Sequence, residues 1–168
     1  MAFHEINPNE MTQDLFDKID KQWMLISAGT PEKSNTMTAS WGGFGVLWFS
    51  KVATIYIRHS RYTLGFVEEQ DRYTLTFLKD GNRDALKICG SKSGREMDKM
   101  HDAGLTPVFV DGQPTFEEAE YVVICKKLYA DDIKEENFCH RETVEKSYPQ
   151  GDYHRMFIGE IEKVYENR

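Results

Sequence analysis

Residues 34–48 bring together side chains that suit ligand binding better than core packing. Small polar side chains come first, at Asn35, Thr36, Thr38 and Ser40, and they form hydrogen bonds without steric bulk. Trp41 then offers a flat apolar surface, and the glycines after it let a ligand approach the backbone. The pattern indicates a site for an anionic or amide-rich ligand that carries a ring. Alternating Ser and Thr are equally typical of a solvent-facing strand, and glycines of a bulge, so both interpretations stay open.

Two later loops combine basic and hydroxyl side chains. The first ends a predicted strand and opens a predicted helix, and it contains Arg58, Ser60, Arg61, Tyr62 and Thr63. The second loop, residues 90–95, contains Ser91, Lys92 and Ser93. Arginine, lysine and hydroxyl groups can replace the water around a phosphate, and a helix start favours anions. A plain Ser cap beside a solvated arginine is the alternative for the first loop.

Several other chemistries find no support in the sequence. The glycines at 42–45 lack the spacing of a dinucleotide-binding turn, and no Gly-Lys-Ser/Thr phosphate loop or Gly-x-Ser-x-Gly occurs. The five histidines and three cysteines are not placed at metal-ligand spacing. We therefore predict no catalytic side chain and no metal site, and a bound cofactor is favoured. A histidine at the end of a strand, such as His154, is more often structural.

Length and charge restrict the class of protein further. A chain of 168 residues fits one domain, residues 1–168, that folds without disulfides. The net charge of −7 argues against nucleic acid or an anionic membrane surface as a partner. Mean hydropathy is −0.59, and the start of the chain does not resemble a signal peptide. With three widely spaced cysteines, the expectation is a reducing, cytoplasmic location.

The elements that would position these residues are mostly strands. Apolar alternation and turn residues predict strands at 22–27, 36–41, 52–58, 72–78, 105–110, 116–129 and 153–165, the last with a kink at Gly159. Helical spacing predicts helices at 7–19, 62–70, 82–89 and 96–101, and a partly helical segment at 135–147. Consecutive strands mostly lack long helical crossovers. An antiparallel, mainly β fold with inserted helices is therefore expected.

Four segments, in order, resemble one known family. Residues 35–41, 60–63, 91–95 and 154–161 are similar to motifs of the flavin reductase-like, FMN-binding split-barrel family, and most similar to its flavoredoxin-like branch. The resemblance implies an antiparallel, Greek-key split β-barrel that forms a homodimer, with one FMN per subunit at or near the interface.

The resemblance also implies which residues hold FMN. Residues 36–41 would border the ring and the ribityl chain, Arg58, Ser60, Arg61 and Thr63 would surround the phosphate, and Ser91, Lys92 and Ser93 would form a second positive wall. Phe157 would line the ring. The complete expected set is Asn35, Thr36, Met37, Thr38, Ala39, Ser40, Trp41, Arg58, Ser60, Arg61, Tyr62, Thr63, Ser91, Lys92, Ser93 and Phe157.

Family membership implies one of two redox functions. The first is an NAD(P)H-dependent flavin reductase, an oxidoreductase in which FMN accepts hydride at N5 and in which His154 would either be structural or assist nicotinamide binding. The alternative is a flavoredoxin-like electron carrier that takes electrons from a partner protein. A ligand-binding barrel without redox function is a third hypothesis. The sequence does not distinguish NADH from NADPH, a prosthetic FMN from a substrate FMN, or one electron acceptor from another.

Overall fold

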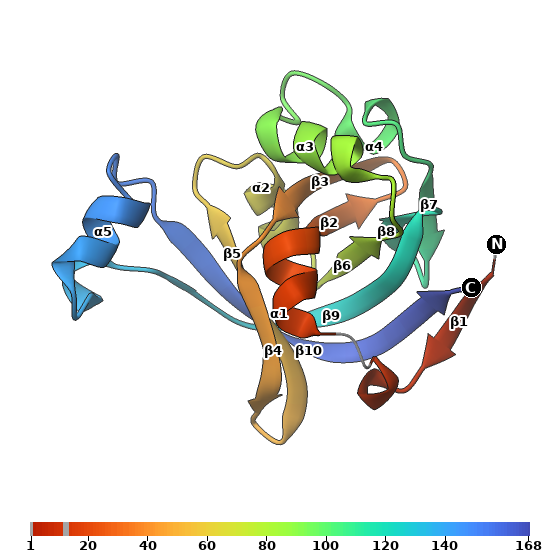
Figure 1. Cartoon of the computed structure of the whole chain (residues 1–168), viewed down its shortest axis with the longest axis horizontal. Helices are drawn as coiled ribbons and strands as arrows, with labels where there is room; N and C mark the ends of the chain where they lie inside the picture. The colour runs from red at the N-terminus through yellow and green to blue at the C-terminus, as the bar shows by residue number, and fades with distance from the viewer. Residues whose placement is uncertain (1, 12–13) are drawn as a thin grey trace.

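The computed structural model describes residues 2–11 and 14–168, and its main element is one antiparallel sheet (Figure 1). The strands of this sheet are β1 (Phe3–Ile6), β2 (Met24–Thr30), β3 (Lys33–Ala39), β4 (Gly42–Leu47), β5 (Ser50–Arg58), β6 (Arg72–Leu78), β9 (Ala119–Asp132) and β10 (His154–Asn167). Their order is β3-β2-β6-β9-β10-β5-β4, and β1 pairs with β10. The expected mainly β, antiparallel architecture is confirmed.

The path of the chain through the sheet is not a simple meander. Strands β5 and β6 follow one another in sequence, but β10 and β9 lie between them in the sheet. Helix α2 (Thr63–Glu69) makes this crossing, which gives the sheet its Greek-key character. Among the described strands, β3 and β4 stand at the two ends of the hydrogen-bonded path and do not pair with each other. The sheet is therefore open, and β3 keeps a free backbone edge.

The main apolar cluster lies on one face of this sheet, and a second cluster, which includes Leu25, packs under α3 (Arg83–Ser91) and α4 (Lys99–Asp102) on the opposite face. In β5, Ala53, Ile55 and Ile57 are fully buried, whereas Tyr56 and Arg58 point to the other face and remain partly exposed. This is the alternation expected from the sequence. It puts an arginine at the open end of a strand whose opposite face is fixed in the core.

Short helices cover one end of the sheet. In Figure 1, α3 and α4 lie above β3 and β2. The remaining helical segments are η1 (Pro8–Glu10), α1 (Leu15–Asp17), η2 (Lys18–Gln22), η3 (Glu135–Asn137) and α5 (Arg141–Ser147). Segment 133–153, which carries η3 and α5, extends away from the sheet (Figure 1). Of the helices in the described ranges, none has the length and apolar content needed to cross a membrane.

Several predicted elements are wrong in extent. The opening helix is broken into η1, α1 and η2, and residues 12–13 of that prediction lie outside the described residues. The predicted strand 116–129 is two strands, because Phe116 ends β8 (Gln113–Phe116), which pairs with β7 (Pro107–Val110). Strands β1 and β4 were not expected. Helix α3 continues to Ser91, and α4 begins only at Lys99.

The predicted kink at Gly159 coincides with a shift in the pairing of β10 with β9. A Cβ at this position would collide with the hydroxyl of Tyr73 and lie 2.9 Å from the Cβ of Cys125. Only glycine therefore lets β10 pass this close to the neighbouring side chains.

The turn between β4 and β5 is strained and apolar. Its two residues, Trp48 and Phe49, have φ values of 51° and 62°, a conformation that such turns usually give to Asn and Gly. Val46, Leu47, Trp48 and Phe49, here called the hairpin tip, are all exposed. In Figure 1 the hairpin projects from the lower edge of the molecule. Neither the backbone geometry nor the exposure of these residues is explained by packing within one chain.

Candidate functional site

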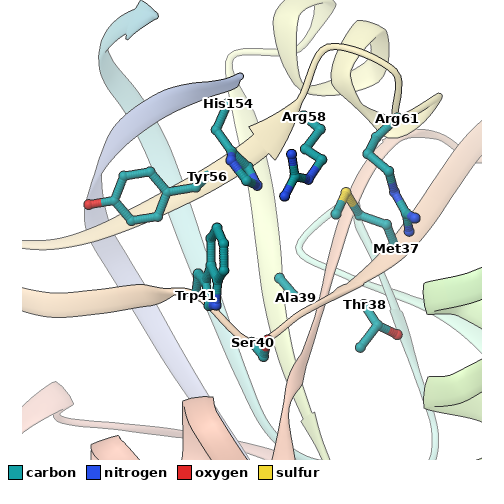
Figure 2. A pocket seen from close by; sticks show the side chains of 9 residues that line it. All are labelled: Met37, Thr38, Ala39, Ser40, Trp41, Tyr56, Arg58, Arg61 and His154. Carbon is teal, nitrogen blue, oxygen red and sulfur yellow. The ribbon is translucent and has the colours of Figure 1, made fainter. Parts of the chain in front are cut away.

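A pocket opens where β3 ends, beside the end of β5 and the start of β10. We call it the central pocket, and its volume is about 200 Å³. It is lined by Met37, Thr38, Ala39, Ser40, Trp41, Tyr56, Arg58, Arg61 and His154. Figure 2 shows Trp41, Arg58 and His154 directed toward the same space. Trp41 and His154 are in ring contact, with centroids 5.1 Å apart.

A second pocket continues from the first across the side chain of Arg61. We call it the basic pocket; its volume is about 170 Å³, and it is lined by Ser60, Arg61, Tyr62, Ser91, Lys92, Ser93, Gly94 and Lys99. Together the two pockets reach the lower end of the roughly 300–1,000 Å³ typical of small-molecule sites. Strand ends and loops that are far apart in sequence therefore form one groove, with a ring-lined part and a basic part.

The guanidinium of Arg61 is fixed between the two pockets by backbone carbonyls. Its two terminal nitrogens donate to the carbonyl oxygens of Gly90, at 2.7 Å, and Cys89, at 3.1 Å. These carbonyls belong to the last turn of α3, where the helix dipole favours a cation. Burial lowers the pKa of Arg61 from its ordinary value, although the group remains charged. Carbonyls orient the guanidinium without neutralising it.

Arg58 is held in a similar way on the other side of the central pocket. It donates to the carbonyl oxygens of Asp152, at 2.6 Å, and Ser147, at 3.1 Å. Its guanidinium also lies 5.2 Å from the ring centre of Tyr148 and 6.0 Å from that of Trp41. Segment 147–152 thus orients the second arginine of the groove.

Lys99 contributes a third cation, and its side chain is almost completely buried. The residue is 2% exposed, and its Nζ donates to the carbonyl of Cys89 at 3.2 Å. Burial, and then the charge of Arg61, lower the pKa of Lys99 to about 8. The same burial raises the pKa of the Cys89 thiol to about 11, so this thiol is protonated and unreactive at neutral pH.

These cations have no acidic partner in the described part of the chain. None of the ion pairs there includes Arg58, Arg61, Lys92 or Lys99, although the chain carries seven more negative than positive charges. Buried charges are normally paired, and an unpaired buried charge destabilises a protein. The groove is therefore arranged for an anion that the chain itself does not supply.

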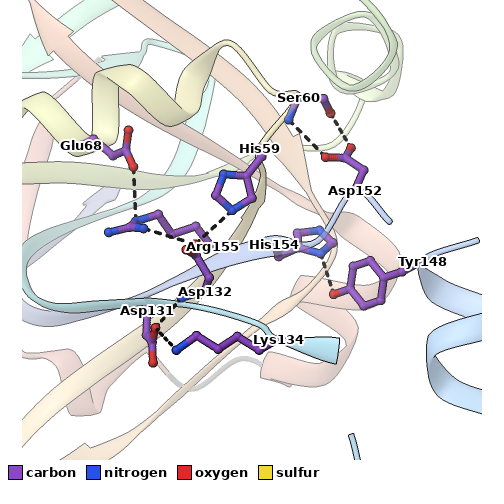
Figure 3. Close-up of polar contacts among 10 residues, drawn as sticks. All are labelled: His59, Ser60, Glu68, Asp131, Asp132, Lys134, Tyr148, Asp152, His154 and Arg155. Carbon is purple, nitrogen blue, oxygen red and sulfur yellow. Dashed lines mark hydrogen bonds and ion pairs between the residues drawn. The ribbon is translucent and has the colours of Figure 1, made fainter. Parts of the chain in front are cut away.

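Ser60, unlike these cations, has no free hydrogen-bond donor for an anion. Its hydroxyl donates to one carboxylate oxygen of Asp152, at 2.6 Å, and its backbone N–H donates to the other, at 3.3 Å (Figure 3). Ser60 was predicted to surround a phosphate, but both of its donors are already bound to a carboxylate. The contact joins the start of α2 to segment 147–152.

His154 forms a neutral wall of the central pocket. Burial, and then the charge of Arg58, lower the pKa of His154 to about 4, so the imidazole is neutral at pH 7. A hydrogen bond of 2.8 Å joins its Nδ1 to the hydroxyl of Tyr148 (Figure 3). The histidine therefore adds no charge to the groove, and its ring orientation is fixed.

The structure brings most, but not all, of the predicted site residues to the groove. Met37, Thr38, Ala39, Ser40, Trp41, Arg58 and Arg61 line the central pocket, and Ser60, Tyr62, Ser91, Lys92 and Ser93 join Arg61 in the basic pocket. The hydroxyl of Thr38 donates to the carbonyl of Leu86 at 2.6 Å, and that of Ser91 donates to the carbonyl of Lys87 at 2.8 Å. These two hydroxyls can still accept hydrogen bonds, but they are not free donors.

Four predicted residues line neither pocket. Asn35 donates to the hydroxyl of Thr63 at 2.8 Å, and Thr36 hydrogen bonds with Ser27, all within the core. Phe157 is 1% exposed and packs in the main apolar core. The expected FMN-binding set did not include four lining residues, Tyr56, Gly94, Lys99 and His154. Nothing in the sequence around Lys99 distinguishes it from a solvated lysine.

Fold and groove together define a β protein with a site suited to an anion beside a ring. A family model for the flavin reductase like domain matches residues 16–168, and the chain belongs to this family. The predicted family membership is thus confirmed. Comparison with curated proteins found no match.

Solved structures share the fold at low sequence identity. Flavoredoxin from Methanosarcina acetivorans is 20% identical with a TM-score of 0.65, over 86% of this chain and 68% of that chain. An FMN-binding domain of a flavin reductases-like enzyme from Shewanella baltica OS155 is 14% identical with a TM-score of 0.70, over 99% and 78% of the two chains. The NADH:FAD oxidoreductase SgcE6 from Streptomyces globisporus C-1027 is 14% identical with a TM-score of 0.65, over 96% and 85%.

The unpaired charge of Lys99 predicts an unusual effect on stability. Its native pKa of about 8 lies below its ordinary value of 10.5, so the unfolded chain binds more protons between these pH values. Stability contributed at this site therefore rises as pH increases from 8 to 10.5. We expect Lys99→Met to stabilise the ligand-free protein at pH 7 by about 2 kcal/mol and to remove this rise, as measured by urea unfolding.

Lys18 provides a matched control, because it is also buried but forms an ion pair with Glu120. Lys18→Met should destabilise the protein by about 1 kcal/mol or more, because it leaves a carboxylate without its partner. If Lys99→Met were instead less stable than the wild type at pH 7, the view of Lys99 as an uncompensated charge would be wrong.

Proposed function

We propose that this protein is a flavin-binding oxidoreductase that holds FMN in the groove formed by the central and basic pockets. The observation that carries the proposal is the set of three carbonyl-held cations, Arg58, Arg61 and Lys99, that lack acidic partners in the described ranges. They lie beside a ring-lined pocket next to the edge of β3. A phosphate joined to a flat, amide-rich ring system matches both parts of the groove.

The donor set of the basic pocket fits a phosphate. The guanidinium of Arg61 and the ammonium groups of Lys92 and Lys99 would face its oxygens, and each charged hydrogen bond contributes about 1.5–3 kcal/mol. Arg58 lies at the central pocket and would face the part of the ligand nearer the ring. Two or three such bonds with ring contacts are enough for micromolar affinity, about 8 kcal/mol.

The lining of the central pocket fits the flavin ring. The outer edge of β3 offers backbone groups that no strand in the described sheet uses, and such groups can hydrogen bond to the polar edge of a flavin. Trp41 and the neutral His154 would bound the ring without adding charge. Hydride transfer is the chemistry that a bound flavin supplies, and the protein contributes orientation and exclusion of water.

We propose NADH or NADPH as the electron donor. An apolar pocket of about 480 Å³ adjoins the central pocket and shares Ser40, Trp41 and Tyr56 with it. It would leave room for a nicotinamide beside the flavin ring. One structural neighbour is an NADH:FAD oxidoreductase and another is a flavoredoxin, so an electron carrier that serves a partner protein is the alternative. A reducing, cytoplasmic location remains part of the proposal and agrees with the exposed free thiol of Cys139.

We also propose that the protein forms a homodimer, with the flavin at or near the interface. The hairpin tip supports association, because Val46 and Phe49 are 77% and 107% exposed. Tyr129 on β9 extends this surface and contacts Trp48, with ring centroids 6.3 Å apart. Apolar side chains held in a strained turn are better explained by a partner than by solvent.

Anaerobic reduction tests the proposed function. Purified protein is mixed with FMN, desalted, and then treated separately with NADPH and NADH while its visible spectrum is followed. We expect retained flavin whose absorbance is lost at a catalytic rate with one or both donors. Retained flavin that neither donor reduces would favour the electron carrier. Absence of flavin binding at any concentration would overturn the proposal.

Arg61→Ala tests the proposed position of the phosphate. The affinity for FMN should fall about 10- to 100-fold, because a charged hydrogen bond pair is lost, while riboflavin affinity changes less than about 3-fold. Arg72→Ala is the control, because Arg72 pairs with Glu162 outside the groove. Equal losses for FMN and riboflavin would show that Arg61 does not contact the phosphate.

A double substitution in the hairpin tip tests the proposed homodimer. Trp48→Asn with Phe49→Gly installs the residues that this turn favours, so the fold should be kept and backbone strain of about 1 kcal/mol or more relieved. We expect the wild type to sediment as a dimer and the variant as a monomer. Phe109→Ser, which changes an exposed aromatic residue on β7, should remain dimeric. A dimeric hairpin variant would place the interface elsewhere.

A further inference from the structure

The apolar pocket beside the central pocket is lined almost entirely by uncharged side chains. Its aromatic rings come from Phe16, Trp41, Tyr56 and Tyr148. Asp20 is the only charged residue among the described residues that line it, and its carboxylate repels anions. The cations of the groove line the central and basic pockets instead. The apolar pocket is therefore suited to an uncharged planar ligand and unsuited to one whose phosphate or carboxylate must enter it.

Two phenol groups give this lining its capacity for hydrogen bonds. In Figure 2 the hydroxyl of Tyr56 points away from Arg58, and no hydrogen-bond partner for it lies within residues 2–11 and 14–168. Tyr148 is close enough for the two phenols to interact electrostatically. Burial is the largest influence on Tyr148 and raises its pKa above the ordinary value, although the charge of Arg58 opposes this. Tyr148 is therefore a protonated donor at neutral pH.

Tyr148 is held in one position between the apolar pocket and the central pocket. Its hydroxyl lies 2.8 Å from Nδ1 of His154, which lines the central pocket (Figure 3). Its ring stacks on Tyr153, with centroids 4.7 Å apart, and meets Phe138 edge to face at 5.9 Å. The residue is only 7% exposed. A phenol is thus fixed where the proposed flavin ring and a ligand in the apolar pocket would meet.

Taking the proposed flavin function as its starting point, we propose that the apolar pocket binds an uncharged para-quinone as electron acceptor and that Tyr148 donates a proton to it. A quinone combines a flat apolar ring with two carbonyl oxygens, and the pocket combines aromatic walls with phenol donors. Its volume of about 480 Å³ accommodates a bicyclic ring. The uncharged nicotinamide of NADH or NADPH would occupy the same pocket earlier in the cycle.

The proposed reduction conserves atoms and electrons. One quinone oxygen receives a hydride from N5 of the anionic reduced flavin, so that an N–H bond breaks and an O–H bond forms. The other oxygen receives the hydroxyl proton of Tyr148, and the products are the hydroquinone and oxidised flavin. His154, with its ring proton on Nδ1, would stabilise the phenolate by donating to it. Solvent would return the proton to Tyr148 once the product leaves.

Equilibrium binding tests the chemistry of the occupant without turnover. Menadione, an uncharged quinone, and naphthoquinone sulfonate, an anionic one, are titrated by calorimetry into the oxidised, FMN-loaded protein. We expect menadione to bind about 10-fold more tightly, because the sulfonate meets Asp20 and no cation. Asp20→Asn should narrow this difference by about 5-fold. Asp84→Asn, which changes a carboxylate that pairs with Lys87 on α3, is the control and should leave the difference unchanged.

Rapid mixing of the reduced, FMN-loaded protein with menadione tests the proton donor. Tyr148→Phe keeps the ring and should slow quinone reduction about 100-fold, because the positioned proton is lost. The rate with ferricyanide should stay within about 2-fold, because ferricyanide accepts electrons without a proton, and the affinity for menadione should fall less than about 5-fold. Tyr153→Phe is the matched control. Its hydroxyl donates to Glu135, so its loss should leave both rates unchanged.

The outcomes separate this inference from the proposed function. Equal affinities for the two quinones, or an unchanged difference in Asp20→Asn, would show that the pocket does not select an uncharged acceptor. If Tyr148→Phe slowed ferricyanide as much as menadione, Tyr148 would be structural, and an unchanged menadione rate would exclude it as the proton donor. In each of these cases the inference fails, while flavin binding and its reduction by NADH or NADPH stand. If FMN were not retained, the proposed function would fail and the quinone step with it.

Discussion

Uncompensated positive charge in an acidic chain is the constraint on which the rest of the groove depends. Arg58, Arg61 and Lys99 each donate to backbone carbonyls, which fix their direction but leave their charge in place. Carboxylates in these positions would stabilise the ligand-free fold more, and they would also block an anion. The lowered pKa of Lys99 shows that its charge destabilises the ligand-free fold, although the same charge favours binding of an anion.

The sheet and helices position the backbone carbonyls that hold these three cations. Helix α3 ends at the groove, so its last carbonyl groups meet Arg61 and Lys99. Segment 147–152 returns to the end of β5, where its carbonyls meet Arg58, and Asp152 fastens it to Ser60. Ala53, Ile55 and Ile57 anchor β5 in the core, so the strand holds Arg58 in place despite the repulsion between neighbouring cations. Binding groups on loops are thus positioned by a rigid sheet.

The sequence was sufficient to predict the parts of the fold in which residue pattern and packing agree. Strands 52–58 and 72–78 alternate clearly, and the structure contains both with the predicted bounds of β6 and nearly those of β5. Strand β4 was missed because Gly42, Gly43 and Gly45 carry no strand preference, and its pairing with β5 decides its conformation. The broken opening helix likewise reflects tertiary packing, since its apolar spacing alone indicates one continuous helix.

For the site, the sequence predicted which residue types take part but not the direction in which each side chain points. The basic loops were identified because arginine and hydroxyl groups cluster in sequence. Thr36 and Thr63 turn inward because partners far along the chain, Ser27 and Asn35, meet them in the core. Lys99 was missed for the opposite reason, because its burial arises only when α4 packs beside the last turn of α3. Such long-range contacts cannot be predicted from the spacing of residues along the sequence.

The pairing of β10 has a consequence for the order of events during synthesis. This strand pairs with β1, β5 and β9 at once, although it is the last strand of the chain. Until it leaves the ribosome, β5 and β9 have no strand between them and β1 has no partner. The sheet is then divided into a four-stranded part, β3-β2-β6-β9, and the β4–β5 hairpin, and both have exposed edges. His154 and the end of β5 meet only in that final step. The nascent chain therefore passes through a period in which its strand edges are exposed to aggregation and the central pocket still lacks His154.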